Sequence, residues 1–149
     1  MREIYLDNAA TTPMSPKVIN VITDEMKNDF GNASSTYELG RKARNVIDKA
    51  RHQIAESINA KDGEIIFTSG GSESNNTAIF GTAYSRKNSG KKIITTKIEH
   101  PSVLNPMKRL EQEGYNIVYL DVDETGHISL DQLKKGIDSG YDSSFNYGC

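Results

Sequence analysis

Hydrophobic residues recur at helical spacing in two stretches of the first half of the chain. Residues 16–27 place four apolar side chains on one face, and Ser15 followed by Pro16 supplies a favoured N-cap and first helical position. Residues 37–58 carry a longer apolar stripe with charged residues on the opposite face. The positions of this stripe are Leu39, Ala43, Val46, Ile47, Ala50, Ile54 and Ile58. Both patterns predict amphipathic helices.

The second half of the chain alternates short apolar runs with segments of helical character. The expected strands are 64–68, 92–97 and 116–122, and the expected helices are 76–87, 102–113 and 129–137. Glycine-containing turns separate them, and Ser129 with Gln132 forms a capping box for the last helix. This alternation predicts an α/β layer fold with a mostly parallel sheet, flanking helices and right-handed crossovers.

Composition narrows the class of protein. The 149 residues include 18 basic and 20 acidic side chains, a balance that argues against nucleic acid as a partner. No apolar run reaches membrane length and no secretory signal pattern opens the chain, so a cytoplasmic location is the default expectation. The single cysteine, Cys149, excludes an internal disulfide, and no His, Cys, Asp or Glu spacing indicates a metal site.

The candidate chemistry begins at the glycine turn of residues 68–76, Thr-Ser-Gly-Gly-Ser-Glu-Ser-Asn-Asn. A strand that turns on glycines into a helix leaves backbone N–H groups free at the positive end of the helix dipole. With the hydroxyls of Ser69 and Ser72, these donors predict a phosphate site around Gly71 and Ser72. Taken alone, such a turn is more often only a connection.

Three further motifs accompany this turn. They are Tyr-Leu-Asp-Asn-Ala-Ala-Thr-Thr-Pro at 5–13, Gly-Asn-Ala-Ser-Ser at 31–35 and Glu-His-Pro-Ser at 99–102. In this order and spacing, the four segments resemble the front of the cysteine desulfurases, which are pyridoxal-phosphate enzymes of the class V aminotransferase group and of fold type I. The resemblance covers residues 4–137. Ala33 stands where the family commonly has proline, and Tyr37 where it has histidine.

The resemblance implies a cofactor and a reaction. Gly71 and Ser72 stand where the family holds the phosphate of pyridoxal 5′-phosphate, and His100 where a histidine lies against the ring and assists proton transfer, as cofactor-binding and catalytic residue. Asn8, Ala9 and Thr11 resemble an arm on the substrate side. The family takes sulfur from L-cysteine as an enzyme persulfide and passes it on for iron–sulfur clusters or thiolated cofactors, and its members are dimers.

The resemblance also implies that important parts are missing. The family's Schiff-base lysine, ring-nitrogen aspartate and sulfur-accepting cysteine belong to segments beyond residue 149, and lysines such as Lys42, Lys49 and Lys61 have the polar surroundings of solvated surface. The expected organisation is an extended arm at 1–15, a partial cofactor-binding large domain at 16–138 and a disordered, non-family tail at 139–149. One hypothesis for this tail is a shifted reading frame.

Three hypotheses about function follow. The first is a truncated cysteine desulfurase-like protein that is inactive alone. The second is a non-catalytic binding fragment, which associates with an intact desulfurase or a sulfur-acceptor scaffold or forms a homodimer. The third is one half of a split desulfurase completed by another chain. In the isolated chain the expected large domain is incomplete, so we expect strand 64–68 to lack a partner and the fold to be marginally stable.

Overall fold

The computed structural model describes residues 4–138. The chain divides into two compact units, Met1–Ile66 and Phe67–Cys149, and each is described by itself. The expected tail at 139–149 lies outside the described residues.

The first unit is helical. After an irregular arm with a turn closed by the Ala10 N–H and the Asp7 carbonyl (3.1 Å), α1 runs over Pro16–Asn28 and α2 over Glu38–Ser57, followed by the short 3₁₀ helix η1, Asp62–Glu64. The Ser15 hydroxyl accepts the N–H of Val18 at 3.4 Å and so caps α1. Both predicted helices are therefore confirmed, including the N-cap.

The loop before α2 packs closely on the first turn of that helix. A Cβ on Gly40 would stand 2.4 Å from the Ser35 carbonyl oxygen, and one on Gly31 would stand 2.4 Å from the Leu39 carbonyl oxygen. The ion pair between Lys42 and Asp29, 2.6 Å long, joins α2 to the residue that follows α1. Glycine at 31 and 40 is therefore required by the approach of backbone to backbone.

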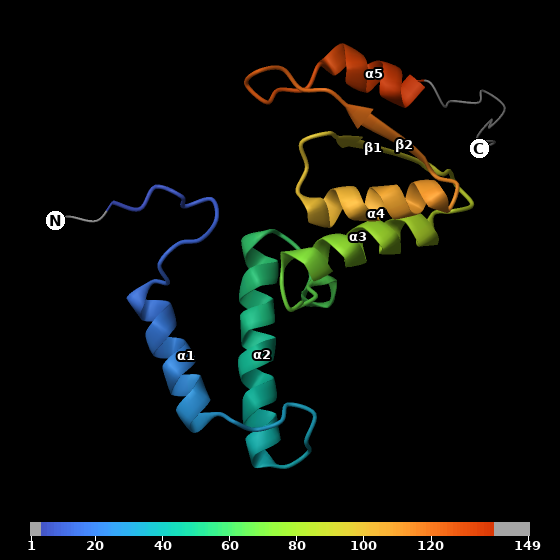
Figure 1. The fold of residues 1–149 in the computed structure, drawn as a ribbon. Coiled ribbons are helices and arrows are strands. Elements are labelled where there is room, and N and C mark those ends of the chain that lie inside the picture. Colours follow the sequence, from blue (N-terminus) through green and yellow to red (C-terminus); the bar gives the residue numbers. More distant parts are fainter. Residues whose placement is uncertain (1–3, 139–149) are drawn as a thin grey trace. The chain divides into compact units, whose positions relative to one another are not determined.

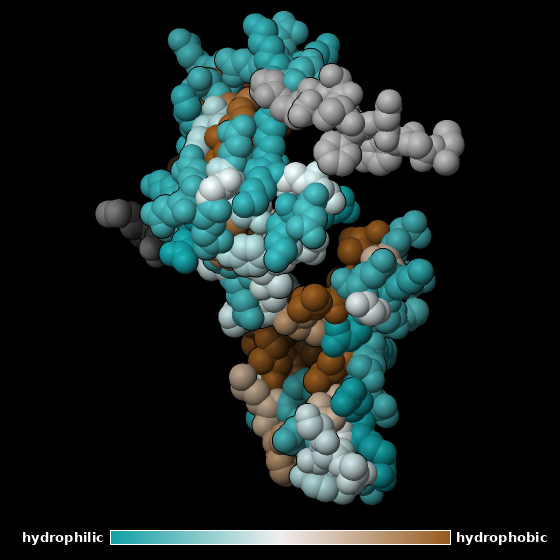
Figure 2. Space-filling model, turned by 90° about the vertical axis from the view of Figure 1, so that its right-hand side faces the viewer, coloured by the Kyte–Doolittle hydropathy of each residue, from teal (hydrophilic) through white to brown (hydrophobic). Residues whose placement is uncertain are grey.

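The apolar faces of α1 and α2 are largely exposed. Figure 2 shows hydrophobic side chains gathered in the lower part of the view, over these two helices. The large exposed members include Val18, Val21, Ile22, Met26, Leu39, Val46, Ile47 and Ile54. The stripes that predict the helices are therefore real, but within the described residues little covers them.

The second unit is an α/β layer structure. Its elements are α3 (Gly71–Ser85), β1 (Lys92–Thr96), α4 (Pro101–Gln112), β2 (Asn116–Leu120) and α5 (Leu130–Asp138). The two strands pair in parallel from Lys92 opposite Asn116 to Thr96 opposite Leu120. In Figure 1, α4 covers one face of this sheet and α5 the other, and α3 packs beside α4. The predicted fold class, a parallel sheet with flanking helices, is confirmed.

Alternate strand residues serve the two layers, as the pleat of a strand requires. Ile93 and its cross-strand partner Ile117 pack towards the core formed by Ala83, Leu110 and Tyr115. Gly136 of α5 lies against the next residue pair, Ile94 and Val118, and against Leu120. A Cβ on this glycine would meet these side chains at 3.5–3.8 Å.

One predicted strand and one predicted helix boundary are wrong. Residues 64–68 do not form a strand: the chain enters them through η1, the guanidinium of Arg51 bonds the Ile65 carbonyl, and the sheet of the described residues has only β1 and β2. A strand exists only where a neighbouring strand completes its ladder. Helix α3 begins at Gly71 rather than Asn76, because the small polar residues after the glycines already have helical geometry.

Candidate functional site

The glycine turn forms the N-terminus of α3. Gly70 is the N-cap residue, with no side chain to satisfy the first helical N–H groups. Among the described residues, nothing accepts a hydrogen bond from the backbone N–H of Gly71 or Ser72, or from the Ser72 hydroxyl. A Cβ on Gly70 or Gly71 would meet no atom within 4 Å. Free donors, open space and the positive end of the dipole together suit a bound anion.

Ser69 does not belong to this set of donors, contrary to the expectation from the sequence. Its backbone N–H and its hydroxyl both donate to the Glu73 carboxylate, at 2.7 and 2.6 Å. These two bonds, that of the hydroxyl first, lower the pKa of Glu73 below its ordinary value. Glu73 thus holds the turn closed. It also places a negative charge beside the phosphate cradle, by which we mean the backbone N–H groups of Gly71 and Ser72 and the Ser72 hydroxyl.

His100 is the N-cap residue of α4, and it makes this cap with its ring. The Ser102 N–H donates to His100 Nδ1 at 3.1 Å, and the Ser102 hydroxyl lies 2.8 Å from the same nitrogen. Pro101 occupies the first helical position, where a missing N–H costs nothing. The side chain that the sequence assigns to the cofactor ring is therefore held by the start of its own helix.

Ser72 of the predicted phosphate site and His100 border one pocket. It has a volume of ≈ 440 Å³, and its polar lining comes from both helices: Ser72, Asn76, His100, Ser102, Asn105 and Arg109. Gly71 adjoins it as the residue before Ser72. The structure therefore brings together the two predicted parts of the site, which lie about thirty residues apart in the sequence.

These residues fit two parts of pyridoxal phosphate. The unsatisfied N–H groups and the hydroxyl of Ser72 suit its phosphate, and the flat ring of His100 suits an aromatic partner. The Arg109 guanidinium also lines the pocket, but it is paired with the Glu113 carboxylate at 2.8 Å. The fit is incomplete, because no lysine of the described residues lines this pocket. The amine that would hold the aldehyde is not among the side chains gathered here.

Asn8, Ala9 and Thr11 belong to the arm of the first unit, and their substrate role stays a prediction. His52 bonds Asp62 at 3.0 Å in the first unit, and the Nδ1 of His127 lies 2.7 Å from the Thr125 hydroxyl in a turn. Within residues 4–138 no cluster of three or more His, Cys, Asp and Glu side chains could hold a metal ion.

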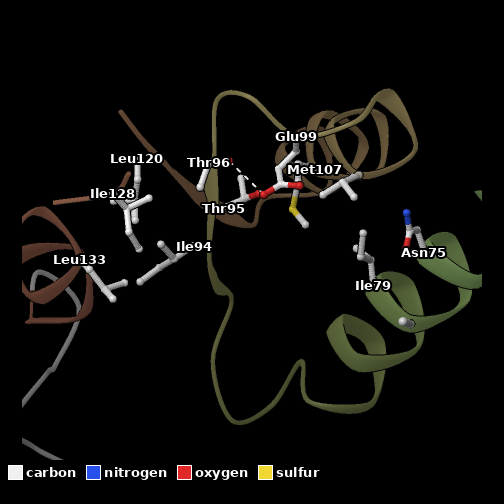
Figure 3. A pocket seen from close by; sticks show the side chains of 12 residues that line it. Asn75, Ile79, Ile94, Thr95, Thr96, Glu99, Met107, Leu120, Ile128 and Leu133 are labelled. Atoms are coloured by element: carbon white, nitrogen blue, oxygen red, sulfur yellow. Dashed lines mark hydrogen bonds between the residues drawn. The ribbon is translucent and has the colours of Figure 1, made fainter. Parts of the chain in front are cut away.

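A second cavity, of ≈ 480 Å³, lies along β1 and contains none of the predicted site residues. Figure 3 shows its walls as two groups, one around Ile94, Ile128 and Leu133, and one with Ile79 and Met107. Its polar features are few, among them the bond from the Thr96 hydroxyl to the Glu99 carboxylate at 3.0 Å. Its lining is largely apolar, and it comes from the sheet and from the helices α3, α4 and α5.

Asn75 and Ser102 are the polar residues that sequence reasoning missed. The Asn75 amide donates to the Ser102 hydroxyl at 2.8 Å and so joins α3 to α4. Both residues stand inside the quoted motifs, yet nothing in the linear order shows that they meet. The only available signal was the His-Pro-Ser order itself, which places a ring acceptor two residues before a helical N–H.

Comparison with known proteins gives the class. The Aminotransferase class-V family matches residues 4–143, nearly the whole chain. The chain therefore belongs to this family, and membership implies pyridoxal 5′-phosphate as the cofactor.

The similar proteins within this class are cysteine desulfurases. Cysteine desulfurase IscS of Dictyoglomus turgidum is 50% identical over 136 residues, which are 91% of this chain and 34% of that protein. The solved structure of a NifS-like protein matches with a TM-score of 0.81 and 34% identity, over 86% of this chain and 35% of the other. A structure of SspA in complex with cysteine gives 0.79 and 39%, over 88% and 38%. The resemblance read from the four motifs is confirmed.

The chain spans about a third of the length of these relatives. Within the described residues, no helix is long and apolar enough to cross a membrane.

Proposed function

We propose that this chain forms the phosphate- and ring-binding part of a pyridoxal-phosphate-dependent cysteine desulfurase. The observation that carries the proposal is the pocket in which Ser72, at the start of α3, and His100, at the start of α4, face the same space. The relatives named above supply the reaction class, and the solved structure of SspA in complex with cysteine supports L-cysteine as the substrate.

The residues of the chain divide the work. Gly71 and Ser72 bind the phosphate through backbone N–H groups and a hydroxyl, and so anchor the cofactor by its charged end. His100 orients the ring and offers a ring nitrogen for proton transfer. When bound, pyridoxal phosphate supplies the electron sink that lets the carbon–sulfur bond of the substrate break.

The reaction needs a lysine and a sulfur-accepting cysteine from outside the described pocket. Cys149 lies outside the described residues, and its sequence setting does not match the family's cysteine loop. Under this proposal, further protein segments supply both groups, in the same polypeptide or in a second chain. The sulfur would then pass to an acceptor for iron–sulfur clusters or thiolated cofactors, in the cytoplasm.

The site can be tested with a matched pair of variants at one position. Gly71→Pro removes one phosphate donor, while proline is well tolerated at the first position of a helix. Gly71→Ala keeps the N–H and adds a methyl group where there is open space. Titration with inorganic phosphate and with pyridoxal 5′-phosphate, followed by ³¹P NMR, should show binding to the unmodified chain and to Gly71→Ala.

We expect Gly71→Pro to weaken both ligands by roughly tenfold, the loss of one charge-assisted hydrogen bond of about 1.5 kcal/mol. Ser72→Ala should weaken both to a similar extent by removing the hydroxyl. Equal binding by the proline and alanine variants, at equal helix content by circular dichroism, would refute the phosphate site.

A further inference from the structure

The Asn75 amide, the Ser102 hydroxyl and the His100 ring form a continuous hydrogen-bonded chain. Asn75 Nδ2 donates to Ser102 Oγ over 2.8 Å, and Ser102 Oγ lies 2.8 Å from His100 Nδ1. The Ser102 backbone N–H also donates to this nitrogen, over 3.1 Å. The chain runs from the helix that bears the phosphate cradle to the ring that faces the same pocket.

The direction of each donor follows from its chemistry. An amide N–H₂ group can only donate, so the Ser102 oxygen accepts a hydrogen bond from Asn75. The Ser102 hydroxyl is then free to donate its own hydrogen bond to the ring nitrogen. His100 Nδ1 then accepts two hydrogen bonds, one from the Ser102 hydroxyl and one from the Ser102 backbone N–H. As an acceptor, this nitrogen carries no proton of its own. In the neutral ring the proton must therefore stand on Nε2.

The same contact fixes the position of the ring. Asn75 and Ser102 are half-buried, and they stand on two helices that pack against each other, α3 and α4. Asn75 lies one helical turn after Ser72, so its bond to Ser102 ties the phosphate donors and His100 to one another. A change in this bond alters the ring without touching the phosphate donors.

We infer that Asn75 and Ser102 are positioning residues, which hold His100 in the Nε2–H tautomer at a fixed distance from the phosphate cradle. The part of the inference that concerns the cofactor rests on the proposed function. The tautomer and the orientation of the ring are properties of the chain itself. They can be measured with no ligand present.

The test is ¹⁵N NMR of the histidine rings in the uniformly labelled chain, above the pH at which the rings are protonated. Asn75→Asp keeps the shape of the side chain but replaces the donor by an acceptor, so the Ser102 hydroxyl turns away from the ring. Ser102→Ala removes the hydroxyl and keeps the backbone donor. Ser85→Ala is the control, because this hydroxyl of α3 donates to the Thr82 carbonyl of its own helix and does not line the pocket.

We expect the two ring nitrogens of His100 to give widely separated ¹⁵N signals in the unmodified chain and in Ser85→Ala. In Asn75→Asp and Ser102→Ala the separation should narrow, as the Nδ1–H tautomer or the protonated ring gains population. His52 and His127 serve as internal references that should not change. Averaged His100 signals in the unmodified chain, or unchanged signals in both variants, would overturn the inference.

Ligand titration separates this inference from the proposed function. Asn75→Ala and Ser102→Ala should weaken pyridoxal 5′-phosphate several-fold and leave inorganic phosphate unchanged, whereas Gly71→Pro weakens both. Equal weakening of both ligands would refute a role confined to the ring. If the tautomer responds as expected but neither ligand binds the unmodified chain, the positioning of His100 stands and the proposed function falls.

Discussion

The phenolic hydroxyl of Tyr115 donates a hydrogen bond to the backbone carbonyl of Ala83 over 2.9 Å, inside the core of the second unit. Ala83 lies in the last turn of α3, where carbonyl groups have no partner within the helix. Tyr115 immediately precedes β2, so this bond ties the end of α3 to the start of that strand. It satisfies a buried acceptor that water does not reach.

Tyr115→Phe should destabilise the chain by about 1–3 kcal/mol, because it leaves the Ala83 carbonyl buried without a donor. Chemical denaturation followed by circular dichroism measures the change. Tyr119→Phe is the matched control, since its hydroxyl bonds the exposed Glu111 carboxylate at 3.2 Å. The control should change the free energy of unfolding by less than about 0.5 kcal/mol. Equal effects of the two variants would contradict the assignment.

Two helical glycines should respond to alanine in opposite directions. Gly40→Ala forces a methyl group against the Ser35 carbonyl and should destabilise the first unit by about 1–3 kcal/mol. Gly81→Ala, on the exposed side of α3 with no atom within 4 Å, should stabilise its helix by about 0.5–1 kcal/mol. Melting curves of the two variants give the signs, and destabilisation by both would show that the open space at Gly81 is filled.

The contact between His52 and Asp62 should make stability depend on pH. The hydrogen bond to Asp62, and then the charge of Asp62, raise the pKa of His52 above 6.5. A raised pKa in the folded chain stabilises it below the unfolded pKa, and this contribution is lost as the pH rises through the folded pKa. At pH 5.5 the free energy of unfolding of Asp62→Asn should therefore be lower than that of the unmodified chain. Above neutrality the two values should converge. A difference that does not depend on pH would contradict this.

Glu73→Gln should separate binding from stability. If phosphate binds at Gly71 and Ser72, loss of the adjacent negative charge should raise its affinity by roughly two- to fivefold. The same loss should weaken α3, because a carboxylate in the first turn interacts favourably with the dipole, by about 0.3–1 kcal/mol. Phosphate titration and thermal melting of one variant check both signs. Lower affinity would place the anion elsewhere.

The exposed apolar faces of α1 and α2 should make the isolated chain associate at high concentration. Apolar patches of this kind promote self-association when nothing covers them. Sedimentation velocity over a hundredfold range of concentration should show a rising mean coefficient. Val21→Lys, which places a charge on the exposed face of α1, should reduce the rise. A coefficient independent of concentration would show that this surface is inert.

Helix formation was predictable because local patterns determine it. The stripes of α1 and α2, the Ser15 cap and the Ser129 cap of α5 depend on residues within one or two turns, and all are observed. The strand expected at 64–68 is not observed, because an apolar run forms a strand only when a second strand pairs with it. Whether such a run becomes a strand depends on a neighbour that is distant in the sequence or absent from it.

The candidate site was predictable in its residues and not in its connections. The motifs lead directly to Ser72 and His100, which the structure places around one pocket. The Ser69 hydroxyl bonds Glu73 and not the phosphate site, and Asn75 bonds Ser102. Both contacts depend on side-chain geometry across turns and between helices. Spacing along the chain carries no information about such contacts.

The Nδ1 atom of His100 caps the N-terminus of α4, and the same contact fixes the orientation of the imidazole ring. Natural selection therefore cannot alter these two properties independently. Asparagine or aspartate at this position would still initiate the helix through a side-chain oxygen but would offer no aromatic plane. In a lineage that had lost the chemistry and kept the fold, drift should leave residues of this helix-capping kind at position 100, serine and threonine among them.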